Sequence, residues 1–379
     1  MSRIDGVGAW VVQWTTSRMC GGAILCVATC VLLAGCERTE TVQRGYRGTA
    51  AHQLYKPSAV EALRELNQIP EAEDPADPDS PPVAEVFKNV QVLTDISSGE
   101  FSRLMQALST WVAPDEGCEY CHNPKKLESD EKYTKVVARR MLQMTRDINT
   151  NWKPHVGTTG VTCWTCHRGQ AVPSGDWFAS VGPHASSNTQ ANYSGKNIPA
   201  PTAGFSALPY DPLSTFLTTG NEIRVQGTTP LVESHGTSIK DAGATYSLMI
   251  YMSQSLGVNC NYCHNTRAMG RWEQSTPQRG TAWHGIRMVR NLNTSYLIPL
   301  QPTFPVNRLS AEGDGPKVGC ATCHKGTFKP LYGASSLKDY PVLSGVQVEP
   351  PAADPGAEAP AKVSAAAPPP APIDVASSR

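Results

Sequence analysis

Eight of the twelve cysteines in this chain fall into four pairs, and each pair is followed directly by a histidine. Two cysteines three positions apart can bond the two vinyl groups of one haem, while the adjacent imidazole binds its iron. At this chain's cysteine and histidine frequencies, about 0.01 copies of C-x-x-C-H are expected by chance. Four copies therefore predict four covalently attached haem c groups. The attachment residues are Cys118, Cys121, Cys163, Cys166, Cys260, Cys263, Cys320 and Cys323, and the proximal iron ligands are His122, His167, His264 and His324.

Other uses of paired cysteines explain this pattern less well. Two C-x-x-C units can hold a tetrahedral zinc ion, and disulfides are common in exported chains. Neither chemistry requires a histidine after all four pairs. The chain has 33 basic and 33 acidic residues, so it lacks the strongly basic footprint of a nucleic-acid-binding protein. Covalent haem is the reading that accounts for all four motifs.

A helix is predicted ahead of each motif. Ser97-x-x-Glu100 is a capping box that opens the first helix, and the second follows Ser129. The third opens with Ser238-x-x-Asp241, and the fourth opens with Thr276 and Pro277, a proline at the first helical position. Apolar residues continue each segment at helical spacing. These four helices must carry candidates for the second iron ligand.

Methionines on these helices are the main candidates for the second ligand, because methionine–histidine ligation suits electron-transfer cytochromes and raises their potential. Met105 precedes Cys118 by 13 positions, and Met249 precedes Cys260 by 11. Met141 lies one helix and one loop before the second motif. Two further methionines share these faces three residues on and remain alternatives: Met144 and Met252.

The sequence repeats itself around the motifs. Cys118–Asn123 (CEYCHN) matches Cys260–Asn265 (CNYCHN), and Thr165–Gly169 (TCHRG) matches Thr322–Gly326 (TCHKG). The segment 146–150 (RDINT) matches 290–294 (RNLNT) at an offset of 144. The chain is therefore predicted to be a duplicated two-haem unit.

The duplication leaves the fourth haem without a methionine. At the offset of 144, Met141 corresponds to Gly285. Met288 and His284 lie near that position, and His155 lies on a strap, Trp152–His155, that is predicted to be non-helical. Spacing along the sequence does not choose among these three candidates.

The N-terminus has the features of an export signal. Arg3 and Arg18 supply positive charge, and the 15 apolar residues from Gly21 to Gly35 are too few to span a bilayer. The run ends in Leu-Ala-Gly-Cys36, which resembles the bacterial lipoprotein signal. We therefore expect residues 1–35 to be removed and Cys36 to carry a lipid anchor, with several acyl chains holding the protein stably on the membrane. An uncleaved anchor is the alternative.

The expected fold class is mainly α, with long loops, little strand and two pseudo-symmetric two-haem halves. The expected segments are the signal peptide, 1–35; a lipid-anchored N-terminal segment with an acidic Pro-rich linker, 36–85; the first haem pair, 86–180; a connecting segment, 181–236; the second haem pair, 237–332; and a Pro/Ala-rich tail expected to be disordered, 333–379.

Between Val86 and Lys329 the sequence resembles the tetrahaem cytochrome subunit of the purple-bacterial photosynthetic reaction centre. The resemblance includes 86–93 (VFKNVQVL), 101–105 (FSRLM), 160–163 (GVTC) with 166–169 (CHRG), and 257–260 (GVNC). It implies methionine as the second ligand of the first three haems and histidine as that of the fourth. Transferred by position, the pairs are Met105 with His122, Met141 with His167, Met249 with His264, and His155 with His324.

The resemblance also implies a function. Electrons would come from a soluble periplasmic cytochrome c or iron–sulfur protein and pass to the photo-oxidised chlorophyll pair of the reaction centre. The protein would sit on the periplasmic face of the bacterial inner membrane, in permanent contact with the membrane subunits of the core. Six-coordinate irons have no open site for substrate, so we expect an electron carrier. The alternatives are a multihaem reductase and a periplasmic carrier unrelated to photosynthesis.

Overall fold

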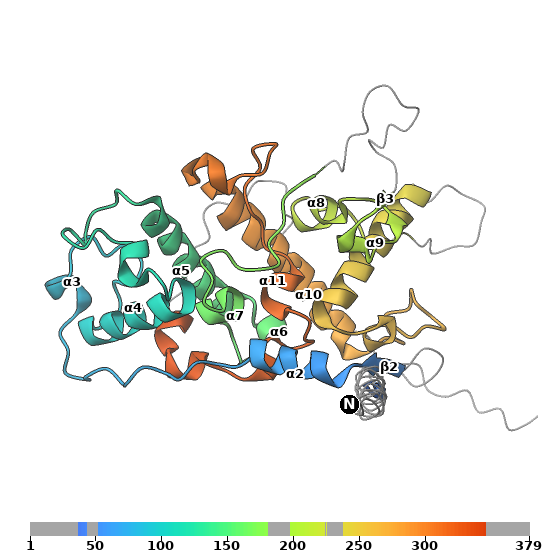
Figure 1. The fold of residues 1–379 in the computed structure, drawn as a ribbon, viewed down its shortest axis with the longest axis horizontal. Coiled ribbons are helices and arrows are strands. Elements are labelled where there is room, and N and C mark those ends of the chain that lie inside the picture. Colours follow the sequence, from blue (N-terminus) through green and yellow to red (C-terminus); the bar gives the residue numbers. More distant parts are fainter. Residues whose placement is uncertain (1–36, 44–51, 181–197, 224, 226–237, 346–379) are drawn as a thin grey trace, which may run out of the picture.

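The computed structural model describes residues 37–43, 52–180, 198–223, 225 and 238–345. Within these ranges the chain is mainly α-helical, as expected, and its strands form two small two-stranded antiparallel sheets (Figure 1). The predicted signal peptide and Cys36 lie outside the described residues, as does 346–379. None of the helices in the described ranges is long and apolar enough to cross a membrane.

The first part of the chain carries two of the motifs. Its elements in chain order are β1 (Glu40–Gln43), β2 (His52–Tyr55), α2 (Pro57–Leu66), α3 (Val83–Val86), α4 (Ser98–Val112), η1 (Gly117–Tyr120), α5 (Tyr133–Asn151), α6 (Lys153–Val156) and α7 (Cys163–His167). Strands β1 and β2 pair with each other.

The second part carries the other two motifs. Its elements are β3 (Ile198–Pro199), η2 (Pro201–Ala203), β4 (Ala207–Leu208), α8 (Pro212–Leu217), α9 (Ile239–Leu256), η3 (Cys260–Tyr262), α10 (Pro277–Leu292), η4 (Asn293–Leu297), η5 (Ile298–Thr303), η6 (Val306–Arg308), α11 (Cys320–His324), η7 (Pro330–Gly333), η8 (Leu337–Asp339) and η9 (Pro341–Ser344). In Figure 1, α4 and α5 lie on the left, α9 and α10 on the right, and α7 and α11 between them.

The predicted helix starts are confirmed at α4 and α9. Ser97 and Ser238 each form a complete capping box with the residue three positions on. Helix α10 begins at Pro277 after Thr276, also as predicted. Helix α5 begins at Tyr133, four residues after Ser129. Side-chain capping therefore places the starts of α4 and α9, whereas α5 and α10 begin without a side-chain cap.

Two hydrophobic clusters form the core, and α5 contributes to both. Leu142 packs with Trp111 and Leu104 of α4 in one cluster. Met144 and Ile148, on another face of the same helix, pack with the second part of the chain. Helix α5 therefore joins the first part of the molecule to the second.

The ordered chain extends beyond the predicted start of the tail at residue 333. The segment 333–345 contains η8 and η9, and Tyr340 and Leu343 are buried in the cluster around α4. The Tyr340 ring meets Trp111 edge-on with centroids 4.7 Å apart. The prediction of a disordered tail is thus wrong for 333–345, because these two apolar side chains complete the core.

The Pro-rich linker is held against α4 by one side chain. Arg103 donates to the carbonyl oxygens of Glu73 and Asp74, both at 2.7 Å, and to that of Asp339 at 2.5 Å. Its guanidinium also lies 4.1 Å from the centre of the Tyr340 ring. One arginine therefore connects the linker, α4 and the C-terminal segment.

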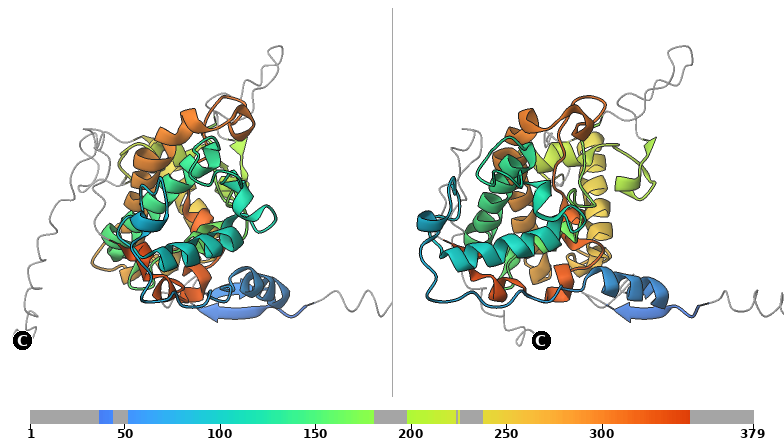
Figure 2. Two further views of the ribbon diagram at one scale, coloured as in Figure 1. Left: turned by 90° about the vertical axis from the view of Figure 1, so that its left-hand side faces the viewer. Right: turned by 60° about the vertical axis from the view of Figure 1, so that its left-hand side comes forward.

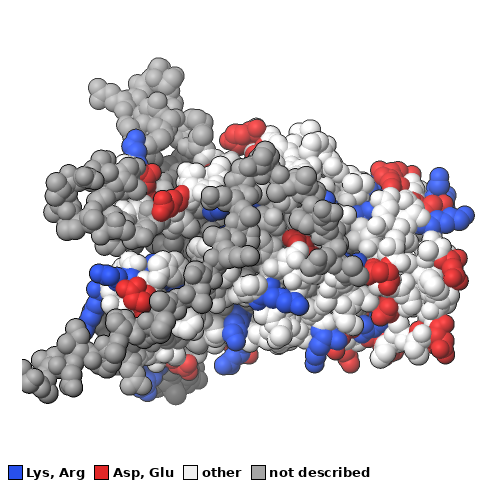
Figure 3. Space-filling view, turned by 180° about the vertical axis from the view of Figure 1, so that it is seen from behind, with Lys and Arg blue, Asp and Glu red and all other residues white. Residues whose placement is uncertain are grey.

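The N-terminal segment lies along one edge of the helical body and contacts both parts of it (Figures 1 and 2). Tyr55 of β2 donates to the carbonyl of Gly257 at 3.2 Å, in the second part. Arg168, directly after the second motif, donates to the carbonyl of Leu66 at the end of α2. Basic and acidic side chains are interspersed on the described part of the face in Figure 3.

Arg146 is a buried cation, only 3 % exposed, on α5. It donates to the carboxylate of Asp95 at 2.6 Å and to the carbonyl of Val342 at 3.0 Å. Burial alone would raise the pKa of Asp95, but the hydrogen bond from Arg146 holds this pKa below its ordinary value. The ion pair therefore stabilises the fold above the ordinary carboxylate range and is lost as pH falls through the lowered pKa.

Arg146→Met is expected to lower the free energy of unfolding by about 2 kcal/mol at neutral pH, because the carboxylate and carbonyls lose their buried donor. Chemical denaturation followed by circular dichroism measures this. Arg64→Met is the control, since the Arg64–Glu61 pair is more than 60 % exposed on both sides and should change stability by less than about 0.5 kcal/mol. Equal effects of the two substitutions at neutral pH would contradict the assignment, and so would a difference that does not shrink at all in acid, where the Asp95 part of the effect is lost.

Candidate haem-binding sites

The four motifs have two local structures. Cys118 and Cys260 open or enter 3₁₀ turns and are exposed, whereas Cys163 and Cys320 open short α-turns and are buried. Burial raises the pKa of Cys163 and of Cys320 to about 12, so both thiols are protonated at neutral pH in the folded chain. A protonated buried thiol is a poor nucleophile.

Every proximal histidine candidate is oriented by the same kind of hydrogen bond. In the first motif of each pair, Nδ1 of the histidine lies close to the carbonyl oxygen five residues further on, at 2.8 Å for His122 and 3.0 Å for His264. In the second motif of each pair, the carbonyl oxygen lies three residues further on, at 2.8 Å for His167 and 2.9 Å for His324. A carbonyl only accepts, so Nδ1 carries the proton and Nε2 keeps its lone pair for a metal.

Burial also keeps three of these imidazoles in the neutral form that binds metals. It lowers the pKa of His167 and of His264, and it lowers the pKa of His324 to about 4. At neutral pH these rings therefore carry no positive charge that would repel a metal ion.

An asparagine clamp holds the backbone ahead of each second motif. The side chain of Asn149 accepts from Val161 N at 2.7 Å and donates to the carbonyl of Val161 at 2.9 Å. Asn293 makes the same two bonds to Val318, at 2.9 and 3.0 Å. Each valine lies two residues before the first cysteine of its motif. The clamp explains why RDINT and RNLNT recur, which the sequence alone did not reveal.

A threonine tie connects each first motif to the helix that follows it. Thr134 of α5 donates to the carbonyl of Tyr120, and Thr276 ahead of α10 donates to that of Tyr262, both at 2.6 Å. Both tyrosines stand immediately before the second cysteine of their motif. Thr276 therefore uses its hydroxyl to hold the motif rather than to cap its own helix.

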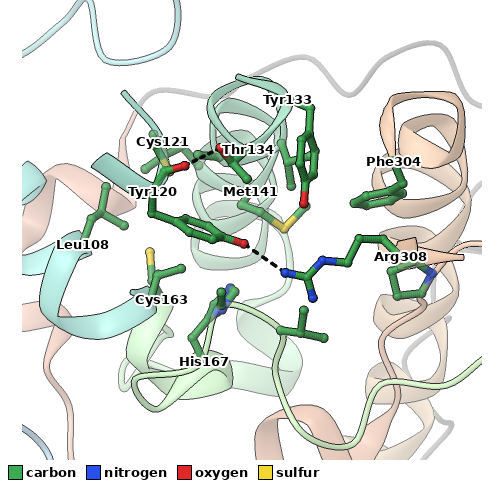
Figure 4. A pocket seen from close by; sticks show the side chains of 17 residues that line it. Leu108, Tyr120, Cys121, Tyr133, Thr134, Met141, Cys163, His167, Phe304 and Arg308 are labelled. Carbon is green, nitrogen blue, oxygen red and sulfur yellow. Dashed lines mark hydrogen bonds between the residues drawn. The ribbon is translucent and has the colours of Figure 1, made fainter. Parts of the chain in front are cut away.

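A cavity lies between Met141 and His167 (Figure 4). The thioether of Met141 on α5 and the imidazole of His167 on α7 both line it, together with the thiol of Cys163. Most of the other lining side chains are apolar, including Leu108, Val112, Val137 and Leu142. A thiol, an imidazole and a thioether around an apolar cavity fit a covalent haem with histidine–methionine ligation. The alternative methionine, Met144, is buried in the core instead.

His155 approaches His324 although the two residues are far apart in the chain. The centroids of their rings are 6.0 Å apart. Nδ1 of His155 lies 2.9 Å from the carbonyl of Thr281, which leaves Nε2 with a lone pair, and burial lowers the pKa of this ring. With metal–imidazole distances of about 2.0 Å, this spacing admits one metal ion between the rings. The pair therefore fits a haem with two histidine ligands.

The strap that carries His155 differs from its prediction. Residues 153–156 form a single helical turn, α6, with Pro154 in its first positions. A proline there needs no backbone N–H and already has a helical φ, so the helix is compatible with it. The prediction of a non-helical strap is therefore wrong.

Gly285 makes room for His155. A Cβ at residue 285 would lie 2.5 Å from the His155 ring, closer than side chains tolerate. Of the other two candidates for this haem, Met288 is buried in the core and His284 stacks edge-on against Trp283 at 4.9 Å. Because any side chain at 285 would collide with the ring of His155, a glycine at this position is what allows His155 to approach His324.

The remaining methionine candidates lie on the expected helices. Met105 is on α4, partly buried, and its carbonyl accepts from Ser109, whose hydroxyl lies 3.5 Å from the sulfur of Cys118. Met249 and Met252 are both on α9, and both pack against the core. Their burial therefore does not choose between them as the second ligand at this site.

The two second motifs meet at the centre of the molecule. The sulfur atoms of Cys166 in α7 and Cys323 in α11 are 2.6 Å apart. The sites built on His167 and His324 are therefore neighbours. Nothing in the spacing of the sequence indicated this contact, because it joins residues 157 positions apart.

The close approach at Gly285 yields a stability test. Gly285→Ala is expected to destabilise the protein by about 1–3 kcal/mol, because the added methyl group overpacks the site of His155. Gly280→Ala is the matched control on the same helix, since a Cβ there meets nothing within 4 Å. It should be neutral or stabilise by up to about 1 kcal/mol. Thermal unfolding followed by circular dichroism compares them, and equal stabilities would contradict the close approach.

Comparison with known proteins shows which family the chain belongs to. The family model described as "Photosynthetic reaction centre cytochrome C subunit" matches residues 35–344. Proteins named photosynthetic reaction center cytochrome c subunit are similar along most of their length. The relative from Rubrivivax gelatinosus is 49 % identical over 322 residues, 84 % of this chain and 87 % of that protein. The relative from Thermochromatium tepidum is 47 % identical over 323 residues, 85 % of this chain and 79 % of that protein. This chain therefore belongs to the family of photosynthetic reaction centre cytochrome c subunits.

Proposed function

We propose that this protein is a tetrahaem electron carrier that re-reduces the photo-oxidised chlorophyll pair of a photosynthetic reaction centre. Its family membership implies an electron carrier with covalently bound haem c, associated with the reaction-centre core in the photosynthetic membrane. The number of haems, four, follows from the four C-x-x-C-H motifs. The observation that carries the proposal is that a second donor side chain faces the proximal histidine, at Met141–His167 and at His155–His324.

When bound, haem c supplies a one-electron iron couple whose potential depends on axial ligands, burial and hydrogen bonds. The eight motif cysteines would hold the haems covalently. The axial pairs we propose are Met105 with His122, Met141 with His167, Met249 with His264, and His155 with His324. In each pair the carbonyl that accepts from Nδ1 of the proximal histidine would leave Nε2 available to bind the iron.

Each of two related halves would hold two of the four haems. The recurrence of the threonine tie and of the asparagine clamp supports this proposal, because both connect equivalent positions in the first and second parts of the chain. The contact of Cys166 with Cys323 supports a junction of the halves through their second motifs. Electrons would cross from one half to the other at that junction.

The location and partners extend the same proposal. A lipid on Cys36 would hold the protein on the periplasmic face of the inner membrane, where it would contact the membrane subunits of the core. A soluble cytochrome c or iron–sulfur protein would deliver the electrons. Such a donor contact is expected to be small and transient.

A multihaem reductase is the second candidate from the enzyme class. It needs an iron with an open coordination position. The positions of Met141 across a cavity from His167 and of His155 beside His324 support second ligands at two of the four sites, and so support the carrier. A periplasmic carrier unrelated to light would share this ligation, so only coupling to the photochemical reaction separates it from the proposed function.

A flash of light tests the function directly. In membranes containing the protein and the reaction centre, we expect oxidation of its haems within micro- to milliseconds, recorded as absorbance changes. Membranes in which Cys320 and Cys323 are both replaced by Ala are the comparison, because they lose one haem and part of the pathway. Haem that stays reduced after the flash in native membranes would refute the reaction-centre role, and rapid carbon monoxide binding to the reduced protein would favour the reductase.

A redox titration tests the ligand assignment at His324. His155→Met is expected to raise the potential of one haem, because methionine stabilises the reduced iron relative to histidine. A tenfold change in the reduction equilibrium corresponds to about 59 mV for one electron. His284→Met is the matched control, since that neighbouring histidine is not in the proposed ligand set. The assignment fails if no component rises, or if both variants shift it equally.

A further inference from the structure

The carbonyl oxygen of Leu127 accepts two hydrogen bonds, and one of them comes from a cation. Nδ1 of His122, the proximal ligand candidate of the first motif, donates to this oxygen at 2.8 Å, and Nζ of Lys135 donates to it at 2.8 Å as well. A carbonyl oxygen has two lone pairs, so it can accept from both groups. Lys135 therefore shares the acceptor that orients this proximal histidine.

Lys135 is only 7 % exposed, and its ammonium group is held by three acceptors. The residue lies in the first turn of α5. Besides the carbonyl of Leu127, Nζ donates to the carbonyl of Ser129 at 2.9 Å and lies 3.3 Å from the carboxylate of Asp130. An ammonium group has three N–H donors, so each of them has a partner. The contacts fix the ammonium group against the loop 127–130, which follows the first motif.

Helix stability does not explain a lysine at this position. The first turn of a helix is the positive end of its dipole, where a cation is unfavourable, and burial of an ammonium group adds a further cost. In α5, which the structure describes throughout, the first turn carries no acidic residue. The three acceptors of the loop 127–130 offset these costs, so Lys135 serves the loop after the motif rather than its own helix.

Lys135 belongs to a group of charges that is positive overall. Arg139, one turn further along α5, pairs with the same oxygen of Asp130 at 2.8 Å. The hydrogen bond from Arg139 is the main cause that holds the pKa of Asp130 well below its ordinary value, so this carboxylate is ionised at neutral pH. Two cations and one carboxylate leave one positive charge. Asp130 therefore weakens the positive field of Lys135 without cancelling that of the group.

We propose that Lys135 raises the potential of the haem bound to His122 by acting through the carbonyl of Leu127. The inference rests on the proposed function, since it requires haem at the first motif. Lys135 is a positioning residue, because it acts on the hydrogen bond of the proximal histidine and supplies no ligand to the iron.

Two causes give the effect on the potential the same sign. A strong hydrogen bond from Nδ1 makes an imidazole a more basic ligand, and a more basic ligand stabilises oxidised iron. Lys135 withdraws electron density from the oxygen of Leu127, so this oxygen is a weaker acceptor for His122. The ammonium group also opposes the positive charge that oxidation adds at the iron. Both causes favour the reduced haem and therefore a higher potential.

Equilibrium redox titration of the purified haem-loaded protein tests this inference. Lys135→Met removes the cation and keeps an unbranched side chain. It is expected to lower one of the four potentials by at least about threefold in the reduction equilibrium, which is about 28 mV because a tenfold change is about 59 mV. Lys126→Met is the matched control, since it removes the same charge from an exposed position directly before Leu127. It should leave all four potentials in place, and equal shifts in the two variants would overturn the inference.

Asp130→Asn should have the opposite effect. It removes the carboxylate that lies 3.3 Å from the ammonium group and leaves Lys135 in place. With less compensation, the positive charge of Lys135 should raise the same potential. If Lys135 and Asp130 only held the loop together, both substitutions would loosen it and would shift the potential in one direction. Shifts of the same sign would therefore overturn the inference.

A third substitution identifies the haem that responds. Met105→His replaces the proposed second ligand of the haem bound to His122 and should lower one component, which marks that haem. In that background, Lys135→Met must lower the marked component again. Movement of an unmarked component would contradict the inference.

Failure of the inference differs visibly from failure of the proposed function. Covalent haem in the wild-type chain survives denaturing electrophoresis and can be stained there. A stained band with potentials that do not respond to Lys135→Met rejects only the role of Lys135. Absence of the stain from the wild-type chain rejects the haem proposal itself. If the methionine variant does not fold, Asp130→Asn still decides, because the expected rise supports the inference and no rise overturns it.

Discussion

The hydrogen bond from a histidine Nδ1–H to a backbone carbonyl is the interaction on which the rest of the structure depends. It occurs after every C-x-x-C-H motif and again at His155. It selects one tautomer and one ring orientation, so that Nε2 is available to a metal. The bond requires the chain to turn back at once. Arg168 and Lys325 accordingly adopt left-handed conformations directly after the second motifs, with φ of 52° and 47°.

These turns stay in place because the helices hold the backbone on either side. The ties from Thr134 and Thr276 fix the end of each first motif, and the clamps of Asn149 and Asn293 fix the approach to each second motif. The helices therefore serve as anchors for short irregular segments. In the proposed ligand set, one residue crosses between the two parts of the chain, since His155 serves the site of His324.

Arginines secure the segments that have little regular structure. Arg103 and Arg146 donate mainly to backbone carbonyls of the linker and of the C-terminal segment. Carbonyls are present at every residue, so such contacts leave no pattern of side-chain types in the partner segment. A Pro-rich composition without periodicity indicated a linker and a tail, and it could not indicate that 71–81 and 333–345 lie against the helical body.

The sequence by itself determined the haem motifs, the helices ahead of them and the duplication, because all three depend on residues within about one helical turn of each other or on repeated text. It also revealed that position 285 holds no methionine. Only the tertiary structure decided that His155 approaches His324 and that Cys166 meets Cys323. Those contacts join residues more than 140 positions apart, and their geometry comes from how α5, α7, α10 and α11 pack. Local spacing specifies which side chains share a helix face, whereas packing specifies which faces meet.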